Sequence, residues 1–273
     1  MIWKFLRGLI SLCFFMLNII ITLYVYINYY RLIRPLRKNS LLKKKHSKCI
    51  IVHNGPSINK IDLAKIKNVD FMTMNRGFLH QNFSIIQPAY HIIVDPKFAK
   101  GIWPIDWLDK IHELSPNTKI VLNSKFLLNK NFRKIIKKYK RNKKLIWILP
   151  ELYINFFSVR RKNSVSTLTY GAGAPGACCS LAHALQYSEV YFCGKDGDGL
   201  LREMLSMKSH FYGNNLENNF KKIDDYIVDL LMMSISLHNW RFYFKTMPKH
   251  GIEFYNMNKT GVFTFMKYKR YEK

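Results

Sequence analysis

The feature that most constrains the fold is an alternation, from about residue 48 onward, between short apolar runs and longer stretches with helical periodicity. The apolar runs lack an alternating polar face, as expected of strands covered on both sides. Strands are expected at 49–53, 71–74, 90–94, 119–122, 145–149, 189–193 and 252–256. Helices are expected near 105–114, 129–140, 176–187 and 223–246. This order predicts an α/β, Rossmann-like fold with a mostly parallel sheet and helices on both faces.

An uncharged segment of 23 residues, 8–30, precedes this part of the chain. It is long enough to cross the hydrocarbon core of a bilayer as one helix, and it lacks the small-residue cleavage site of a signal peptide. Two basic residues stand before it and seven follow it within residues 31–45. The positive-inside rule therefore predicts a single-pass membrane protein whose C-terminal domain is cytoplasmic. We expect a transmembrane anchor and basic juxtamembrane segment in 1–38, and the Rossmann-like domain in 39–273.

The charge of the chain limits its partners. Lys and Arg number 44 against 17 Asp and Glu, a net charge of +27. Such a surplus favours polyanionic partners: nucleic acid, an anionic membrane or phosphorylated substrates. Because the sequence already contains a membrane segment, membrane lipid is the expected partner, also for the basic stretch 131–144. Nucleic-acid binding would rest on charge alone and is not expected.

The five cysteines show no C-x-x-C or other paired spacing, which argues against a zinc site or a disulfide framework. They are expected to be reduced cysteines of the core.

The first expected strand ends in the turn Asn54-Gly55-Pro56-Ser57. A glycine lets the backbone approach a ligand closely, and Ser57 is placed to cap a following helix while donating to a phosphate. The turn lacks both the G-x-G-x-x-G of dinucleotide sites and the lysine of a P-loop. It therefore favours a mononucleotide-linked donor over ATP bound at a P-loop.

Several motifs resemble one enzyme family. "IIVHNGPSI", "MNRGF", "HIIVDPKF", "EVYFCGKDGDG" and "KSHFYGNN" follow one another between residues 48 and 258. In this order they resemble bacterial sialyltransferases of glycosyltransferase family 42. The "EVYFCGKD" segment is also similar to a wider superfamily that includes 6-hydroxymethylpterin diphosphokinase-like and motility-accessory proteins.

The resemblance implies a set of donor-binding residues. Asn54, Gly55 and Ser57, with Pro56 between them, would line the nucleotide phosphate and ribose, and Asn75 would contact the donor. Asp95 stands where the family usually has a donor-binding Asn. Gly173, with Gly171 and Ala174, occupies the region that faces the donor carboxylate. Asp196 would lie near the cytosine ring of the nucleotide. The family requires no metal and no cofactor beyond the CMP-linked donor.

The resemblance also implies catalytic positions, and here the chain departs from the family. His210 matches the first histidine of the family's Ser-His-Tyr-x-Gly-His pattern, but Asn214 stands at the second, where the general base is expected. The tyrosine pair that supports the leaving phosphate has no counterpart after Asp196. We nominate His210 as the base, because an imidazole titrates near neutral pH. Tyr212 would donate to the leaving phosphate.

The expected function is that of a membrane-anchored glycosyltransferase, sialyltransferase-like, acting on a glycan or glycolipid precursor of lipopolysaccharide or capsule. A long stretch without periodicity, 194–222, is expected to form a lid. Two alternatives stay open. One is a pyrophosphokinase-like phosphotransferase, whose only evident metal ligands are Asp95, Asp196 and Asp198. The other is a non-catalytic nucleotide-sugar-binding membrane protein, favoured by Asn214. A homo-oligomer is compatible with the sequence.

Overall fold

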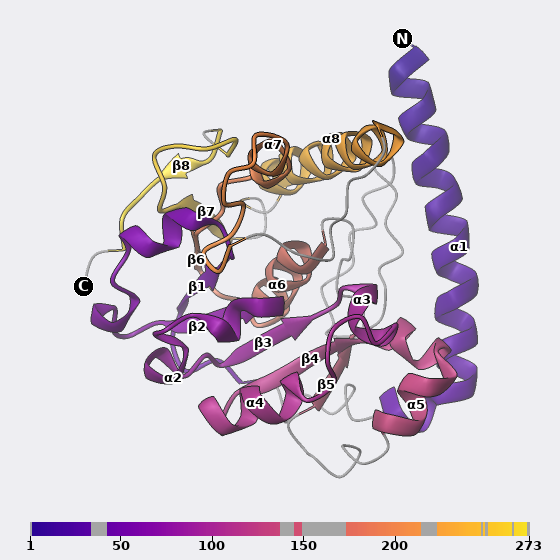
Figure 1. The fold of residues 1–273 in the computed structure, drawn as a ribbon, viewed down its shortest axis with the longest axis horizontal. Coiled ribbons are helices and arrows are strands. Elements are labelled where there is room, and N and C mark those ends of the chain that lie inside the picture. The colour runs from indigo at the N-terminus through magenta and orange to yellow at the C-terminus, as the bar shows by residue number, and fades with distance from the viewer. Residues whose placement is uncertain are drawn as a thin grey trace.

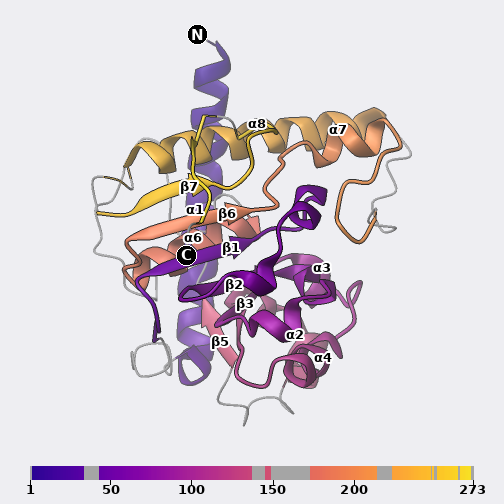
Figure 2. The same cartoon turned by 90° about the vertical axis from the view of Figure 1, so that its left-hand side faces the viewer.

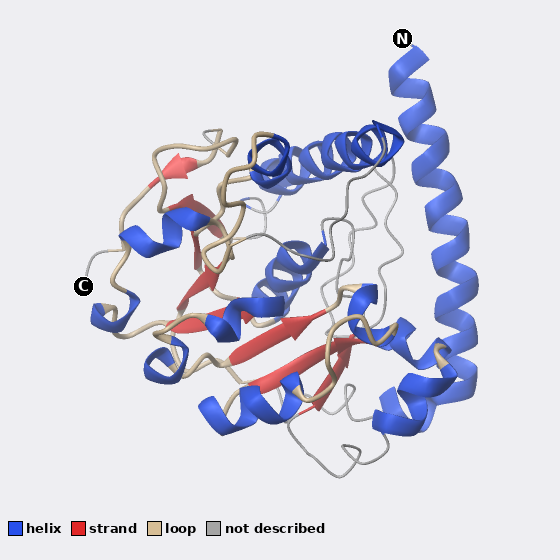
Figure 3. Ribbon diagram, in the orientation of Figure 1, coloured by secondary structure: helices blue, strands red, loops and turns tan. Residues whose placement is uncertain are grey.

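The computed structural model describes residues 2–33, 43–136, 145–148, 173–213, 223–246, 248, 251–263 and 265–271. These residues form an eight-stranded sheet with helices around it (Figure 3). Position 214 lies outside the described residues, and so do residues 149–172, which include position 171 of the expected donor region.

Every strand pair of the sheet is parallel. The strands are β1 (Lys48–Val52), β2 (Asp70–Met74), β3 (Tyr90–Ile93), β4 (Lys119–Asn123), β5 (Leu145–Ile148), β6 (Glu189–Cys193), β7 (Glu253–Asn256) and β8 (Lys267–Tyr268). Their spatial order is β5-β4-β3-β2-β1-β6-β7-β8, and Figure 2 shows them stacked from β7 down to β5. Strands β2 to β5 follow one another on one side of β1, and β6 to β8 follow one another on the other side. The strand order therefore reverses between β1 and β6, which makes the gap between their carboxyl ends the topological switch point.

Helices lie on both sides of the sheet (Figure 1). The α-helices are α1 (Ile2–Ile33), α2 (Phe83–Ile86), α3 (Pro96–Ala99), α4 (Trp107–Leu114), α5 (Lys130–Ile136), α6 (Gly173–Ala184), α7 (Gly199–Met204) and α8 (Ile223–Thr246). Short 3-10 helices are η3 (Pro56–Lys60), η4 (Leu63–Lys65), η5 (Asn75–Leu79) and η6 (Ser124–Leu128). The long helix α1 packs against η6 and β5, and α8 crosses above the sheet near β7.

The core has two apolar clusters, one on each face of the sheet, because successive side chains of a strand point to opposite faces. In β1, Cys49 and Ile51 enter one apolar cluster, while Ile50 and Val52 enter a second cluster on the opposite face. All four side chains are buried, because a parallel strand in the middle of the sheet is covered on both faces. The first cluster contains α6 and Trp240 of α8, and the second is closed by η3 and η4.

The seven strands and four helices expected from the sequence are confirmed, with ends that differ by at most three residues wherever the structure describes them. Residues 137–140 of the helix expected at 129–140 lie outside the described part. The strand β8 was not predicted, because it has only two residues and both are exposed. Within the expected lid at 194–222, residues 199–204 form α7 instead of an irregular loop. Of the five cysteines, four are buried in the core, and all are free thiols.

The segment expected to span a membrane, 8–30, lies entirely within α1. In the part of the chain that the structure describes, no helix reaches the length and apolarity that a membrane crossing requires.

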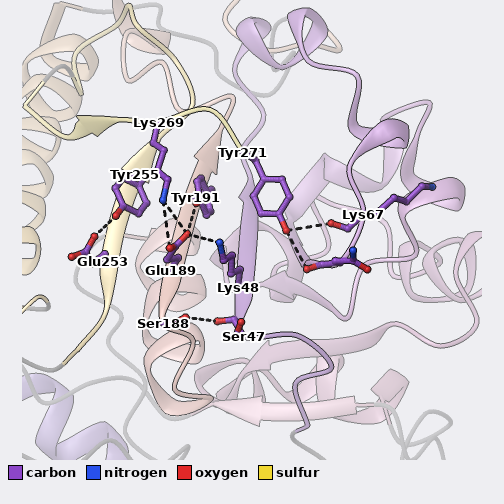
Figure 4. A network of polar contacts seen from close by, with 11 residues as sticks. Ser47, Lys48, Lys67, Ser188, Glu189, Tyr191, Glu253, Tyr255, Lys269 and Tyr271 are labelled. Atoms are coloured by element: carbon purple, nitrogen blue, oxygen red, sulfur yellow. Dashed lines mark hydrogen bonds and ion pairs between the residues drawn. The ribbon is translucent and has the colours of Figure 1, made fainter. Parts of the chain in front are cut away.

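The C-terminal segment joins a network of polar contacts with residues of β1, β6 and β7 (Figure 4). Glu189 accepts from the Lys48 ammonium at 3.2 Å and from the Lys269 ammonium at 3.4 Å. Lys269 also lies over the Tyr255 ring, 4.5 Å from its centroid. The Tyr271 hydroxyl donates to the carbonyls of residues 67 and 68. These contacts hold residues 269–271 against one face of the sheet, where Lys269 and Tyr271 also lie against the Tyr191 ring in the middle of β6.

Candidate functional site

Two backbone hydrogen bonds join the loops that follow β1 and β6. The His53 amide donates to the Cys193 carbonyl at 2.8 Å, and the Gly55 amide donates to the Gly194 carbonyl at 2.9 Å. They extend the β1–β6 pairing beyond the ends of the strands. The turn Asn54-Gly55-Pro56-Ser57 therefore lies at the switch point, where ligands bind in open α/β sheets.

Residue 55 must be glycine because there is no room for a side chain. A Cβ atom at this position would lie 2.5 Å from the Gly194 carbonyl oxygen and 2.5 Å from Oδ2 of Asp196. Gly194 has a φ of +70°, in the left-handed region that favours glycine. The two loops thus approach each other more closely than any side chain at residue 55 allows.

Asp196, only 7% exposed, connects the β1 and β6 loops with the loop after β7. Its carboxylate accepts from the Ser57 amide at 3.1 Å and from the Ser57 hydroxyl. It also accepts from the Asn258 side-chain amide at 2.7 Å, which contacts the Ser57 hydroxyl as well. The cluster gives the buried carboxylate the donors that it needs. Asn258 was not among the residues nominated from the sequence, although it follows an expected strand as they do.

The capping role expected of Ser57 is wrong. The helix that follows is the 3-10 helix η3, which begins at Pro56 with Gly55 as its N-cap and has no side-chain cap. Ser57 lies inside this helix, and both of its donors reach Asp196 instead. Its contact with a phosphate stays a prediction.

Asn54 and Asn75 place two acceptor atoms at the ends of adjacent strands. Asn54 donates from Nδ2 to the Met74 carbonyl at 3.4 Å, so its side chain spans from β1 to β2. The side-chain oxygens of Asn54 and Asn75 are buried, and neither has a hydrogen-bond partner among the described residues. A buried amide oxygen without a partner costs free energy. These two oxygens are therefore candidates for binding a hydroxyl or amino group of a ligand.

A buried histidine holds Asn75 in place. Nδ1 of His91 lies 2.7 Å from the Thr73 hydroxyl, and Nε2 lies 2.9 Å from the Asn75 carbonyl oxygen. Since a carbonyl only accepts, Nε2 carries the proton and Nδ1 accepts from Thr73. Burial lowers the pKa of His91 to about 3, so the ring is neutral at physiological pH. Asn75 has a φ of 48°, and the His91 bond helps to keep this left-handed conformation.

The turn that carries His210 is docked on Asn54. The amide of Phe211 donates to the Asn54 carbonyl at 2.9 Å, and the Phe211 ring packs edge-on against His80. His210 and Gly213 exchange two backbone hydrogen bonds, which closes the turn. The rings of His210 and Tyr212 are 4.9 Å apart, and both residues are half-buried. The structure therefore places these two nominated residues beside the β1 turn.

Arg76 was missed by the sequence reasoning. Its guanidinium lies 5.5 Å from the ring centroid of Tyr212, and 5.8 and 5.6 Å from those of Trp103 and Trp107. Three aromatic faces thus surround one cation that follows Asn75 directly, and such contacts orient an arginine for anion recognition. The signal was present in the motif "MNRGF", of which only the asparagine was considered.

The other nominated residues take separate positions. Asp95 caps α3, because its side chain accepts from the Lys97 amide at 2.9 Å. Gly173, with a φ of +65°, is the first residue of α6. Asp198 pairs with Arg202 at 2.8 Å, and Asn214 lies outside the described residues. In the described part of the chain, no three His, Cys, Asp or Glu side chains cluster around a point that a metal could occupy.

No protein-family model matches the chain, and a search of curated proteins finds no match. Among solved structures, the chain aligns with a sialyltransferase CST-II in complex with a trisaccharide acceptor and CMP, at 18% identity and a TM-score of 0.47. That alignment covers 81% of this chain and 84% of the other. It also aligns with CstII from Campylobacter jejuni bound to CMP-3FNeuAc, at 17% identity and a TM-score of 0.47, covering 82% and 86%.

A third alignment is with the monofunctional alpha-2,3-sialyltransferase Cst-I from Campylobacter jejuni. It has 14% identity and a TM-score of 0.43 and covers 84% of this chain and 82% of the other. These structures belong to the enzyme class that the sequence motifs resemble. Because the identities and TM-scores are low, the functional argument below rests on the residues of this chain.

Proposed function

We propose that this protein is a glycosyltransferase that uses a CMP-linked donor and transfers sialic acid or a related acidic sugar. The observation that carries the proposal is the pair of buried amide oxygens of Asn54 and Asn75 at adjacent strand ends, which have no hydrogen-bond partner among the described residues. Asn54 lies at the switch point of the parallel sheet, and Asn75, at the end of the adjacent strand β2, directly precedes Arg76. The motif resemblance to glycosyltransferase family 42 supports the same assignment.

The nucleotide part of such a donor has matching groups in this site. The two amide oxygens accept from ribose hydroxyls or from the amino group of cytosine. The Arg76 guanidinium suits a phosphate, which it can bind through two parallel hydrogen bonds. The missing side chain of Gly55 lets the β1 turn lie directly against the β6 loop that carries Asp196. Asp196 shapes the turn through Ser57 and Asn258.

The transfer needs one base and stabilisation of the leaving group. His210 takes the proton from the acceptor hydroxyl as that oxygen bonds to the anomeric carbon of the sugar. The bond between the anomeric carbon and the donor phosphate breaks at the same time, and CMP leaves with the electron pair. Tyr212 donates its hydroxyl proton in a hydrogen bond to the phosphate, and Arg76 offsets the developing charge. The docking of Phe211 on Asn54 holds the base next to the donor turn.

We also propose that α1 anchors the enzyme to a membrane, with the sheet domain on the cytoplasmic side and a membrane-linked glycan precursor of lipopolysaccharide or capsule as acceptor. Large apolar side chains of α1 are exposed: Leu9, Leu12, Met16, Ile20, Leu23 and Ile27 are between 46% and 75% accessible. A lipid environment would cover them. Basic α5 lies beside the end of α1, because the Arg133 guanidinium stacks over the Tyr29 ring at 5.4 Å. This position suits contact with anionic lipid headgroups.

The test is binding of CMP to the full-length protein, measured by calorimetry and by the shift in melting temperature. CDP, UDP, GDP and ATP serve as comparisons, with and without magnesium. A nucleotide at 100 times its Kd stabilises the folded state by about 2.7 kcal/mol. We expect a metal-independent shift with CMP that Asn54→Ala removes. The control is Asn117→Ala, because Asn117 is exposed in the turn before β4, at the opposite edge of the sheet.

Other outcomes of this experiment select the alternatives. A shift only with ATP and magnesium would favour the phosphotransferase. That enzyme needs Asp95, Asp196 and Asp198 to share a metal, whereas these carboxylates bond separately to Lys97, Ser57 and Arg202. Binding of CMP without hydrolysis or transfer of a CMP-linked sugar would favour the non-catalytic binding protein. An unchanged CMP affinity in His210→Ala, with transfer lost, would support His210 as the base.

A further inference from the structure

Lys195, directly after the Gly194 that contacts Gly55, is buried, and no residue in the described part of the chain pairs with it as an anion. The residue is 7% exposed, and its ammonium lies 4.1 Å from the ring centroids of both Trp240 and Phe263. It forms no hydrogen bond and no ion pair with any residue that the structure describes. Two aromatic faces compensate only part of the cost of removing an ammonium from water. A lysine in this environment gains when an anion binds next to it.

His53 adds a second unsatisfied group to the same place. The residue is 5% exposed, and its Nε2 is buried without a hydrogen-bond partner in the described part of the chain. Its ring packs on Phe192 at 5.4 Å, and Phe192 meets Trp240 edge-on at 5.9 Å. His53 and Lys195 therefore border one region, between the carboxyl ends of β1 and β6 and the helix α8.

The electrostatics agree with this geometry. Burial lowers the pKa of Lys195 to about 7. Burial, and after it the positive charge of Lys195, lower the pKa of His53 well below its ordinary value. The titratable groups that face Lys195 from α6 are Cys178 and Cys179, and burial raises the pKa of both thiols. Neither thiol is ionised near neutral pH, so none of these neighbours supplies a negative charge.

We propose that Lys195 and His53 form a subsite for an anionic group of the ligand, a phosphate or a carboxylate oxygen, within the nucleotide-sugar site. This inference rests on the proposed function. It adds that the ligand must carry a negative charge next to Lys195 and His53. The Lys195 ammonium pairs with the anionic oxygen, and Nε2 of His53, as the protonated nitrogen of the neutral ring, donates to it. The Trp240 and Phe263 rings exclude water from the pair, which strengthens it.

The distinguishing measurement is proton uptake on binding. At pH 8 a lysine with a pKa of about 7 is mostly neutral, and a bound anion favours its charged form. Calorimetry of CMP and of CMP-N-acetylneuraminic acid binding to the full-length protein, in buffers of different ionisation enthalpy, should therefore show proton uptake at pH 8 for the compound that carries the anion, and less uptake at pH 6. A purely structural lysine would not produce this difference.

Three variants test whether the proton uptake comes from Lys195. Lys195→Met should abolish the uptake and weaken binding of the compound that showed it about tenfold or more. Lys195→Arg, which keeps a charge that does not titrate, should bind CMP without uptake, and it also serves if the Met variant does not fold. Lys110→Met is the matched control, because Lys110 is exposed on α4 and pairs with the exposed Asp106 of the same helical turn. A weakening by Lys195→Met for CMP and not for cytidine identifies the phosphate, whereas a weakening only for CMP-N-acetylneuraminic acid identifies the carboxylate.

Failure of the inference and failure of the proposed function give different results. CMP binding with no proton uptake, unchanged in Lys195→Met for both CMP and CMP-N-acetylneuraminic acid, overturns the subsite and leaves the function standing. No binding of either compound to the parent protein overturns the function. In that case inorganic phosphate tests the subsite in the melting assay. Stabilisation at pH 6 that Lys195→Met removes and Lys110→Met keeps supports it, and equal stabilisation of all three proteins overturns it.

Discussion

The substitution Gly55→Ala tests the close approach of the β1 and β6 loops. Gly55 has φ −67° and ψ 152°, a conformation that alanine adopts freely, so the effect of the change is steric and not conformational. The new Cβ would lie 2.5 Å from the Gly194 carbonyl oxygen and 2.8 Å from Cγ of Asp196. Only separation of the two loops can relieve both contacts.

That separation has a cost that can be worked out from the bonds between the loops. Overpacking of this kind costs about 1–3 kcal/mol. Lengthening the Gly55–Gly194 backbone bond, now 2.9 Å, adds about 1 kcal/mol, and weakening the Ser57–Asp196 bond, now 3.1 Å, adds about 1.5 kcal/mol. We expect a total loss of about 4 kcal/mol in the free energy of unfolding, together with loss of CMP binding.

The assay is urea denaturation of the full-length protein, followed by tryptophan fluorescence. The control is Gly199→Ala at the start of α7, where the added Cβ would be 3.9 Å from the nearest atom, Cβ of Ser209. It should change the unfolding free energy by about 0.5 kcal/mol or less. If Gly55→Ala proves as stable as this control, the two loops are not in the contact described, and the site built on them must be abandoned.

Three further predictions follow from other contacts. Because burial lowers the pKa of His91 to about 3 from an ordinary 6.5, the unfolded chain binds a proton between these values that the folded chain does not. The free energy of unfolding should therefore fall as the pH drops below 6.5, by about 1.4 kcal/mol per unit from this residue, and His91→Gln should remove that part of the slope in urea titrations at pH 5 and 7. Tyr187→Phe removes a 2.7 Å hydrogen bond to the buried Asp70 carboxylate and should cost about 1.5–3 kcal/mol by the same assay, whereas a cost below that of Tyr271→Phe, at a half-buried tyrosine that donates to backbone carbonyls instead of a carboxylate, would contradict the network. Arg76→Leu should weaken CMP binding about tenfold in calorimetry, with partial recovery in Arg76→Lys, and equal affinity in all three proteins would exclude Arg76 from the site.

The sheet could be predicted from the sequence because each central strand is an unbroken apolar run. A run such as residues 49–52 is compatible with little else than a strand covered on both faces, and its neighbours repeat the pattern. The position of the Asn54–Ser57 turn followed as well, since ligand loops stand at the carboxyl ends of parallel strands. The strand β8 and the short helices α2, α3 and α7 could not be predicted, because segments of two to six residues carry too little periodicity.

The contacts of the site belong to the tertiary structure. The sequence indicates that Asn54, Asn75, Asp196 and His210 follow or lie near strand ends, because local patterns of apolar and turn-forming residues are sufficient for that. It does not indicate that Ser57 bonds to Asp196, 139 residues away, instead of capping a helix, or that Arg76 is enclosed by aromatic rings. Nor does it distinguish Lys195 from the other lysines of a strongly basic chain. Burial and pairing of a side chain depend on which distant elements the strand order brings together, and that order is set by the packing of the whole sheet with its helices.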